Sequence, residues 1–179
     1  MNKKIRILIG YASKHGSTAE IADFIGKELK SKKTTVDIQP VIQVESVENY
    51  DVVIIGSPIY YGKWLAEIPE FVEINLEKLI NIPVACFITF MAAIKTDEDN
   101  IKEANGHLTK SLAQIPRIKP FKTGYFAGKL DYKKCTLIET ILMKVIMMWK
   151  GAEAGDYRNW SIIKSWTSAV LNVVELPES

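Results

Sequence analysis

A hydroxyl-rich loop near the amino terminus carries the residues best suited to bind an anion. It consists of Ser13, Lys14, His15, Gly16, Ser17 and Thr18. Three of these side chains carry hydroxyl groups, and Gly16 lets a ligand approach the backbone closely. A helix that begins at such a loop points unpaired N–H groups and the positive end of its dipole toward the loop. The loop therefore predicts a site for a phosphate monoester.

The two most common phosphate-binding motifs are absent from the sequence. No Gly-x-x-x-x-Gly-Lys-Ser/Thr is present, and no Gly-x-Gly-x-x-Gly follows the first apolar run, which argues against a P-loop nucleotide hydrolase and a standard dinucleotide-binding fold. The alternative is an ordinary turn between a strand and a helix, with Ser13 or Ser17 as the N-cap. A lone His15 is more often a surface or packing residue, although beside a phosphate it can donate a hydrogen bond.

Strand-like and helix-like segments alternate along most of the chain. Apolar runs predict strands at residues 5–11, 35–40, 52–56, 84–90 and 122–127. Apolar residues at helical spacing predict helices at residues 18–31, 68–75 with an extension, 99–114 and 162–174. This alternation predicts a doubly wound α/β fold with a parallel sheet, in which ligands bind beyond the carboxyl ends of the strands.

Two further loops are expected at the same end of the sheet as the hydroxyl-rich loop. The residues of interest in them are Ser57, Pro58, Ile59, Tyr60, Tyr61, Gly62 and Trp64 after the third predicted strand, and Phe90, Met91 and Ala92 at the end of the fourth. Aromatic rings stack on planar apolar ligands, and glycine permits close backbone approach. We therefore expect Tyr60, Tyr61 or Trp64 to flank a planar ring; the alternative is that these aromatic side chains cap the core.

The composition is that of an ordinary globular protein. The chain has 179 residues, of which 47% are hydrophobic and 25% charged, so residues 1–179 are expected to form one domain with a proper core. The net charge is +2 and the lysines are dispersed, which argues against a nucleic-acid partner.

Targeting and metal-binding signals are also absent from the sequence. The first predicted strand begins at Ile5, which leaves no room for a signal peptide, and no apolar stretch reaches the roughly 20 residues that span a bilayer, so a cytoplasmic location is expected. Cys86 and Cys135 lie far apart and outside any Cys or His cluster. Neither a disulfide nor a metal site is therefore expected.

An unusually apolar segment follows the fifth predicted strand. Only Glu139, Thr140 and Lys144 interrupt the apolar side chains that nearly surround the helix predicted at residues 136–149. A small core cannot bury such a helix completely, and the helix is too short to span a bilayer. We expect it to pack under the domain, to form an interface between copies of the chain, or to present an apolar surface to a lipid or substrate.

The hydroxyl-rich loop resembles the phosphate loop of the flavodoxin family, usually written Ser/Thr-x-Thr-Gly-x-Thr, with His15 in place of the family's threonine. The segment from Gly56 to Tyr60 also has the family's Gly-Ser/Thr-Pro-x-Tyr character. The resemblance implies a flavodoxin-like three-layer sandwich whose five parallel strands lie in the order 2-1-3-4-5. It also implies an FMN cofactor held by residues 13–18, by the aromatic segment and by backbone groups at residues 90–92.

The second half of the chain resembles one group within that family, the menaquinone-dependent protoporphyrinogen IX dehydrogenases of haem biosynthesis. The resemblance lies in residues 126–132, in the apolar run 143–148 and in Asn159-Trp160, and Tyr60 stands where the group has an arginine. It implies an FMN-dependent oxidoreductase that takes electrons from protoporphyrinogen IX or a similar apolar substrate and passes them to a quinone.

The same resemblance implies a role for the apolar segment. Residues 136–149, within an insert at about residues 129–158, would form an apolar wall of the substrate site and dock on the cytoplasmic side of a membrane. No catalytic acid–base pair is evident. The alternatives are an electron carrier of the flavodoxin type, an NAD(P)H:quinone reductase, or a binding protein that has lost FMN. Electron-carrying flavodoxins are typically acidic, so the charge of +2 weakens the first of these.

Overall fold

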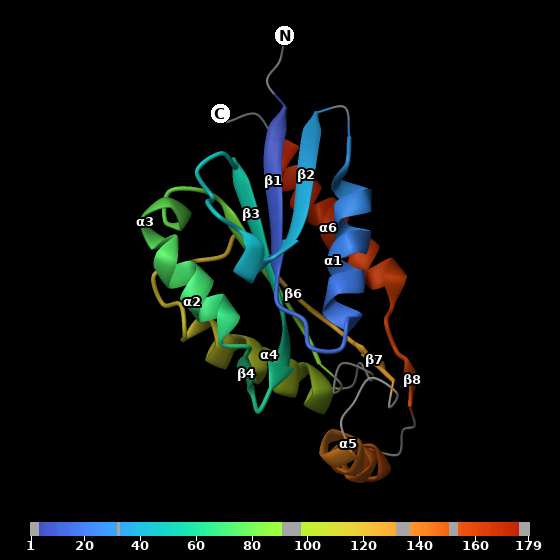
Figure 1. The fold of residues 1–179 in the computed structure, drawn as a ribbon. Helices are drawn as coiled ribbons and strands as arrows, with labels where there is room; N and C mark the ends of the chain where they lie inside the picture. The colour runs from blue at the N-terminus through green and yellow to red at the C-terminus, as the bar shows by residue number, and fades with distance from the viewer. Residues whose placement is uncertain (1–3, 32, 91–97, 132–136, 151–153, 176–179) are drawn as a thin grey trace.

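The fold is built on a parallel β-sheet (Figure 1). A computed structural model describes residues 4–31, 33–90, 98–131, 137–150 and 154–175. The parallel strands are β1 (Ile5–Tyr11), β2 (Thr34–Pro40), β3 (Val52–Tyr60), β5 (Val84–Thr89) and β6 (Lys122–Phe126). They lie in the order β2-β1-β3-β5-β6, with β4 paired to β3 outside this path. The flavodoxin-like strand order predicted from the sequence is confirmed.

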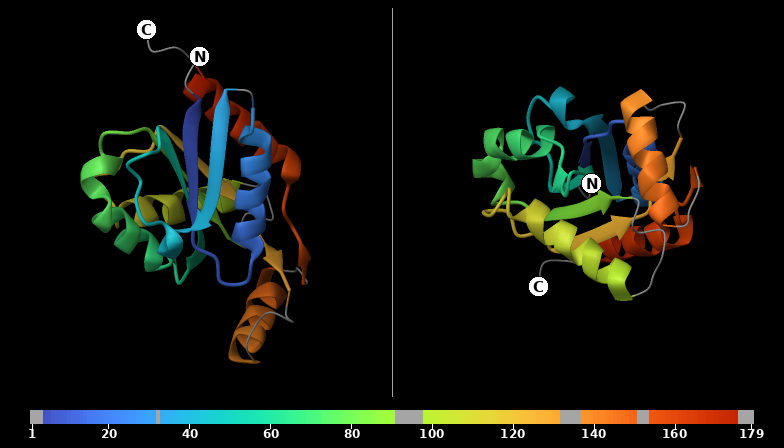
Figure 2. Two further views of the ribbon diagram at one scale, coloured as in Figure 1. Left: turned by 45° about the horizontal axis from the view of Figure 1, so that its top comes forward. Right: turned by 90° about the horizontal axis from the view of Figure 1, so that it is seen from below.

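Helices cover both faces of the sheet (Figure 2). They are α1 (Ser17–Leu29), α2 (Glu67–Ile74), α3 (Leu76–Leu79), α4 (Glu98–Leu112) and α6 (Trp160–Glu175), with a 3₁₀ turn, η1, at Val41–Gln43. Successive side chains of β1 point to opposite faces. Ile7 and Ile9 pack with α1 and α6, whereas Leu8 packs with α2. This alternation explains why β1 reads as a continuous apolar run, because both of its faces are buried.

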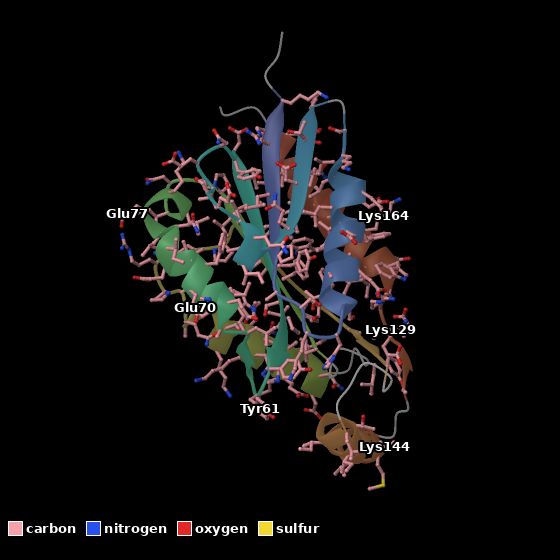
Figure 3. All side chains as sticks on the ribbon, in the orientation of Figure 1. Tyr61, Glu70, Glu77, Lys129, Lys144 and Lys164 are labelled. Atoms are coloured by element: carbon pink, nitrogen blue, oxygen red, sulfur yellow. The ribbon has the colours of Figure 1, made fainter. Side chains whose placement is uncertain are left out.

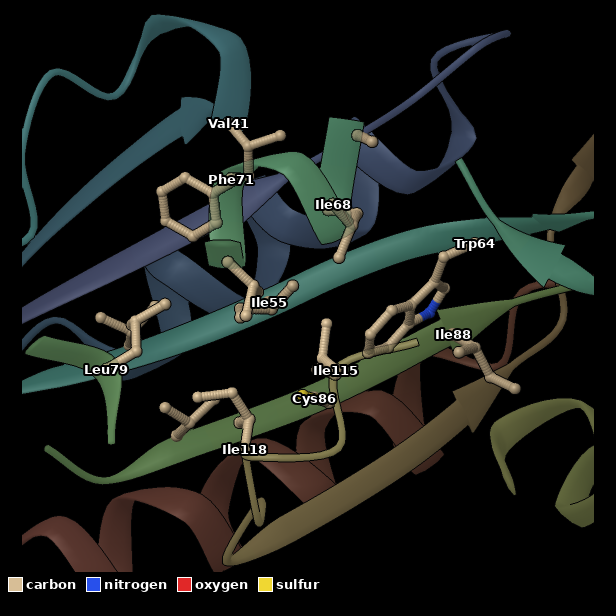
Figure 4. Packing of buried hydrophobic residues seen from close by; sticks show 14 of the residues in the cluster. Val41, Ile55, Trp64, Ile68, Phe71, Leu79, Cys86, Ile88, Ile115 and Ile118 are labelled. Carbon is tan, nitrogen blue, oxygen red and sulfur yellow. The ribbon is translucent and has the colours of Figure 1, made fainter. Parts of the chain in front are cut away.

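The core on the α2 face reaches from η1 to the segment that follows α4. Figure 4 shows Phe71 and Ile68 of α2 above Ile55 of β3, with Ile115 and Ile118 on the other side of the cluster. Full burial of each large aliphatic or aromatic side chain contributes about 1.5–3 kcal/mol. This packing fixes the strands whose carboxyl ends carry the predicted site.

The third strand runs farther than the sequence predicted. It was expected to end at Gly56, but β3 continues to Tyr60, and β4 (Lys63–Trp64) pairs back on it in antiparallel register. The expected loop is therefore mostly a β-hairpin. Its two turn residues, Tyr61 and Gly62, have φ of 49° and 78°, and positive φ at both positions is the geometry of a two-residue hairpin turn.

The apolar helix lies outside the main body of the fold. Two short strands, β7 (Lys129–Leu130) and β8 (Gly155–Asp156), pair with each other, and α5 (Leu137–Lys150) lies between them in sequence. Figures 1 and 2 show α5 beyond the carboxyl ends of the parallel strands, set apart from the two helix layers. Among the described residues, no helix has both the length and the apolar character needed to cross a membrane.

Candidate functional site

The hydroxyl-rich loop closes tightly between β1 and α1. Gly16 adopts a left-handed conformation with φ of 88°, at the position that precedes the first residue of α1. Its N–H donates to Ser13 Oγ at 3.2 Å, and its carbonyl accepts from Glu20 N at 3.0 Å. Within the described residues, no side chain caps this end of α1. The first N–H groups of the helix therefore suit an anion, and the residues present fit a phosphate group.

The last two residues of the loop are linked to distant parts of the chain. Ser17 Oγ accepts the N–H of Lys129 at 2.9 Å, which leaves the hydroxyl proton for donation to an anion. Thr18 is 1% exposed, and its hydroxyl shares a hydrogen bond of 2.8 Å with that of Thr89 at the end of β5. Ser17 thus joins the loop to the start of β7 and is half-buried, whereas Thr18 joins the loop to the sheet beneath it.

The hydroxyl-rich loop meets the hairpin at Tyr60. The Nζ of Lys14 lies 4.6 Å from the centre of the Tyr60 ring, and the ring centres of His15 and Tyr60 are 6.2 Å apart. An ammonium group over an aromatic face is attracted by the negative face of the ring. A positive side chain and an aromatic ring predicted from separate segments are therefore brought together at the carboxyl edge of the sheet.

The two aromatic residues beside Tyr60 have opposite environments. Tyr61, labelled at the lower edge of the domain in Figure 3, is 91% exposed and has a positive φ, which is uncommon for a residue other than glycine. Trp64 is 4% exposed and lies in the core shown in Figure 4. Side chains alternate along β4, and Lys63 takes its exposed side, so Trp64 points inward. The core-capping alternative applies to Trp64.

The other predicted residues of these segments support the hairpin and the end of β5. Ser57 is fully buried; its hydroxyl accepts from Leu65 N at 3.2 Å and donates to the Pro58 carbonyl at 3.0 Å. Ile59 pairs with Trp64 across the hairpin. Phe90 is buried beside the His107 ring, with a centroid distance of 5.5 Å. Met91 and Ala92 lie outside the described residues.

Sequence reasoning missed His107, which lies on α4 beneath the hairpin turn. A Cβ atom placed on Gly62 would lie 3.8 Å from its Nδ1. That nitrogen is buried and has no hydrogen-bond partner among the described residues, whereas Nε2 lies 3.5 Å from Glu103 Oε1. Buried polar atoms without a partner are uncommon, so this imidazole is a polar group of the site. The sequence offers no signal for it, because no motif surrounds this histidine.

A second missed residue is Arg158, which follows β8. Its guanidinium donates to both carboxylate oxygens of Asp156 and to Glu20 in the first turn of α1. The side-chain hydrogen bond from Arg158 lowers the pKa of Asp156 below its usual range. The two partners lie at sequence separations of 2 and 138, so only the fold brings Glu20 into reach.

The described cysteine and acidic residues add neither a reactive thiol nor a metal-binding cluster to the site. Burial raises the pKa of the Cys86 thiol, so this cysteine is held as an unreactive core residue. No group of three or more His, Cys, Asp or Glu side chains that could hold a metal ion occurs in the part of the chain that the structure describes. The described site therefore consists of backbone N–H groups, hydroxyls, one lysine, two histidines and two tyrosines, with Arg158 and its two carboxylate partners beside the first turn of α1.

Comparison with known proteins decides the family. A model of the flavodoxin domain matches residues 8–156. The chain belongs to the flavodoxin family. Protoporphyrinogen IX dehydrogenase (quinone) from Escherichia coli strain K12 is 27% identical over an alignment of 180 positions, which covers 97% of this chain and 98% of that protein. The protein of the same name from Leishmania major is 27% identical over 171 residues, which cover 91% of this chain and 73% of its own length.

Solved structures of flavodoxins share the fold. Flavodoxin 2 from Bacillus cereus, in its oxidised form, matches with a TM-score of 0.52 and 25% identity over 82% of this chain and 99% of its own. A flavodoxin from the domain Archaea matches with a TM-score of 0.53 and 15% identity over 96% and 100%. The predicted resemblance to the flavodoxin family and to its protoporphyrinogen dehydrogenases is thereby confirmed.

Proposed function

We propose that this protein is an FMN-dependent oxidoreductase that oxidises protoporphyrinogen IX, or a similar apolar substrate, and passes the electrons to a quinone. The observation that supports the cofactor is the uncapped amino end of α1 behind Gly16. Support for the substrate class comes from relatives that match 97% of the chain, the insert included, and are named protoporphyrinogen IX dehydrogenase (quinone).

In this proposal, the hydroxyl-rich loop holds the phosphate of FMN. The N–H groups of the first turn of α1 and the Ser13 and Ser17 hydroxyls donate to phosphate oxygens, and Thr18 holds the loop on the sheet through Thr89. Lys14 adds a positive charge beside the aromatic segment. FMN, when bound, supplies the two-electron redox chemistry. The chain positions it and shields it from competing reactions.

The hairpin and the end of β5 form the proposed ring site. Tyr60 and the exposed Tyr61 are the aromatic candidates for contact with the flavin or the substrate. Gly62 presents backbone without a side chain, and the backbone at Met91 and Ala92 is proposed to bind the other edge of the ring. No residue is assigned as a catalytic acid or base.

The α5 helix is the proposed membrane contact. Its exposed apolar residues are Leu137, Ile138, Ile141, Val145 and Met148. Positions 137, 141, 145 and 148 are spaced along one helical face, and Lys144, labelled in Figure 3, is exposed beside them. An apolar face with an adjacent cation suits the interface of an anionic bilayer. Docking there, on the cytoplasmic side, would bring the site to a quinone dissolved in lipid.

The test is cofactor reduction and reoxidation in the purified protein. We expect protein reconstituted with FMN to be yellow, to bleach anaerobically with protoporphyrinogen IX and to recover its absorbance with menaquinone. The Gly16→Val variant should lose FMN, because a side chain is strained at φ of 88° and fills the phosphate site. Gly106→Val is the matched control, since a Cβ at Gly106 meets no atom of the described residues within 4 Å.

The outcomes separate the competing functions. A yellow protein that is inert toward both compounds would contradict the dehydrogenase and favour an electron carrier, or an NAD(P)H:quinone reductase if a reduced nicotinamide bleaches it. A protein that stays colourless after incubation with FMN would contradict the cofactor itself. Full FMN occupancy in Gly16→Val would contradict the assignment of the phosphate loop.

A further inference from the structure

The base of the insert, formed by β7, β8 and the residues just after β8, makes two hydrogen-bonded contacts with the first turn of α1. The N–H of Lys129, at the start of β7, donates to Ser17 Oγ at 2.9 Å. Arg158, just after β8, donates from its guanidinium to Glu20 Oε2 at 2.5 Å. The start of β7 and the residue that follows β8 by two positions therefore both contact the first turn of α1, and Figure 3 shows Lys129 near the start of this helix.

Arg158 is far more buried than its acidic partners. Its side chain is 5% exposed, compared with 45% for Glu20 and 41% for Asp156. The guanidinium pairs with Asp156 through two nitrogens and lies 4.6 Å from the centre of the Trp160 ring, which in turn packs on Phe24 of α1 at 4.8 Å. A planar guanidinium held by a paired carboxylate and an aromatic ring has one orientation.

Glu20 creates an electrostatic problem for an anion at this site. It lies in the first turn of α1, the same turn whose N–H groups are proposed to receive a phosphate. A carboxylate there interacts favourably with the helix dipole and so competes with a bound anion, and it repels a phosphate dianion directly. The Arg158 guanidinium compensates this charge from the side of the insert.

We propose that Arg158 is the residue that makes this site select FMN over riboflavin, by compensating the charge of Glu20 and fixing the base of the insert against Ser17. The inference rests on the proposed FMN site. Phosphate is the only group that distinguishes the two ligands, so the contribution of Arg158 is measured by their relative affinities rather than by either affinity alone.

The experiment measures dissociation constants for FMN and riboflavin by quenching of flavin fluorescence. In Arg158→Gln we expect FMN binding to weaken about tenfold or more, the size of one lost charge-assisted contact, with riboflavin binding changed less than about twofold. Glu20→Gln in that background should restore much of the FMN affinity, and Arg158→Lys should lie between wild type and Arg158→Gln. Arg117→Gln is the matched control, because Arg117 pairs with Glu77 at 3.4 Å on the surface.

The proposal is overturned if Arg158→Gln weakens FMN and riboflavin equally, or changes neither more than Arg117→Gln does. In the first case Arg158 would only support the fold. Should Arg158→Gln fail to fold, Glu20→Gln alone decides: tighter FMN binding with unchanged riboflavin binding supports the proposal, and an unchanged ratio overturns it. Wild-type protein that binds no FMN would overturn the proposed function as well, whereas FMN binding with unaltered selectivity would overturn this inference alone.

Discussion

Two helices of the carboxyl-terminal third, α5 and α6, are both rich in apolar residues but have different surroundings. In α6, Ile163 and Val170 are completely buried against the sheet. In α5, Ile138 and Ile141 are 79% and 57% exposed. Apolar composition therefore predicts that a helix needs a partner, while the chain topology decides whether that partner lies within the domain. The β7–β8 pairing carries α5 away from the sheet, and α6 returns to it.

The largest difference in stability should appear when one charge is placed in α6 and, in a second variant, in α5. Val170→Asp puts a carboxylate in the core, which is expected to cost more than about 4 kcal/mol of unfolding free energy. Ile138→Asp, on the exposed face of α5, should change the free energy of unfolding by less than about 0.5 kcal/mol. Urea denaturation followed by circular dichroism measures both; a comparable loss in the two variants would remove the distinction between the helices.

The exposed face of α5 should contribute to membrane binding rather than to stability. The double variant Ile138→Asp/Ile141→Asp is expected to weaken co-sedimentation with phosphatidylglycerol vesicles at least about tenfold, because two apolar side chains no longer enter the bilayer interface. Ile42→Asp/Ile74→Asp is the matched control, since these isoleucines are 76% and 82% exposed elsewhere. If the α5 variant binds vesicles normally but loses a dimer seen by analytical ultracentrifugation, α5 is an interface between copies of the chain.

A smaller loss of stability should show how much one hydrogen bond contributes to holding α6 on the sheet. Trp166 Nε1 donates to the Thr123 carbonyl of β6 at 2.8 Å. Trp166→Phe keeps an aromatic ring in the core but loses this hydrogen bond and some volume, so we expect a loss of about 1–3 kcal/mol in thermal or urea unfolding. An unchanged stability would show that α6 is held by apolar packing alone.

The smallest effect concerns the acid sensitivity of the base of the insert. Because the folded-state pKa of Asp156 is lowered by Arg158, its ionised form stabilises the folded state above the unfolded-state pKa of about 3.9. That contribution is lost as the pH falls through the lowered pKa. Asp156→Asn should therefore cost less than about 1 kcal/mol at pH 7, given the partial exposure, and nothing below both pKa values. Urea unfolding across this pH range tests it, and a cost independent of pH would contradict it.

The sequence predicted those parts of the fold and of the candidate site that depend on residues close together in the chain. The five parallel strands followed from apolar runs alternating with helical spacing, their order followed from the resemblance to the flavodoxin family, and the turn at Gly16 followed from its residue types. The hairpin was missed because Ile59 and Tyr60 extend β3 past Gly56, a boundary that the proline and glycine of the segment obscured. Trp64 was one of three candidates to flank a planar ring, and the sequence could not separate it from Tyr60 and Tyr61 because its burial depends on alternation along a strand that was not predicted.

The missed site residues depend on contacts between distant segments. The pairing of Arg158 with Glu20 requires the chain to return from the insert to the start of α1. His107 becomes a site residue only because α4 packs beneath the turn at Gly62. Hydroxyls, glycines and aromatics close together in sequence predicted a ligand-binding site. Single ionisable residues such as His107 and Arg158 formed no local pattern that could identify their role.

The pairing of β7 with β8 also makes the insert a separable module. Leu130 and Gly155 face each other in register, so the chain leaves the domain and re-enters it at nearly the same point. A two-residue Asn-Gly turn could join them in place of residues 131–154 without moving any strand of the main sheet. Such a junction lets an appendage be gained, exchanged or lost during evolution while the rest of the domain keeps its architecture, and it marks where the α5 segment could be transplanted onto a relative that lacks it.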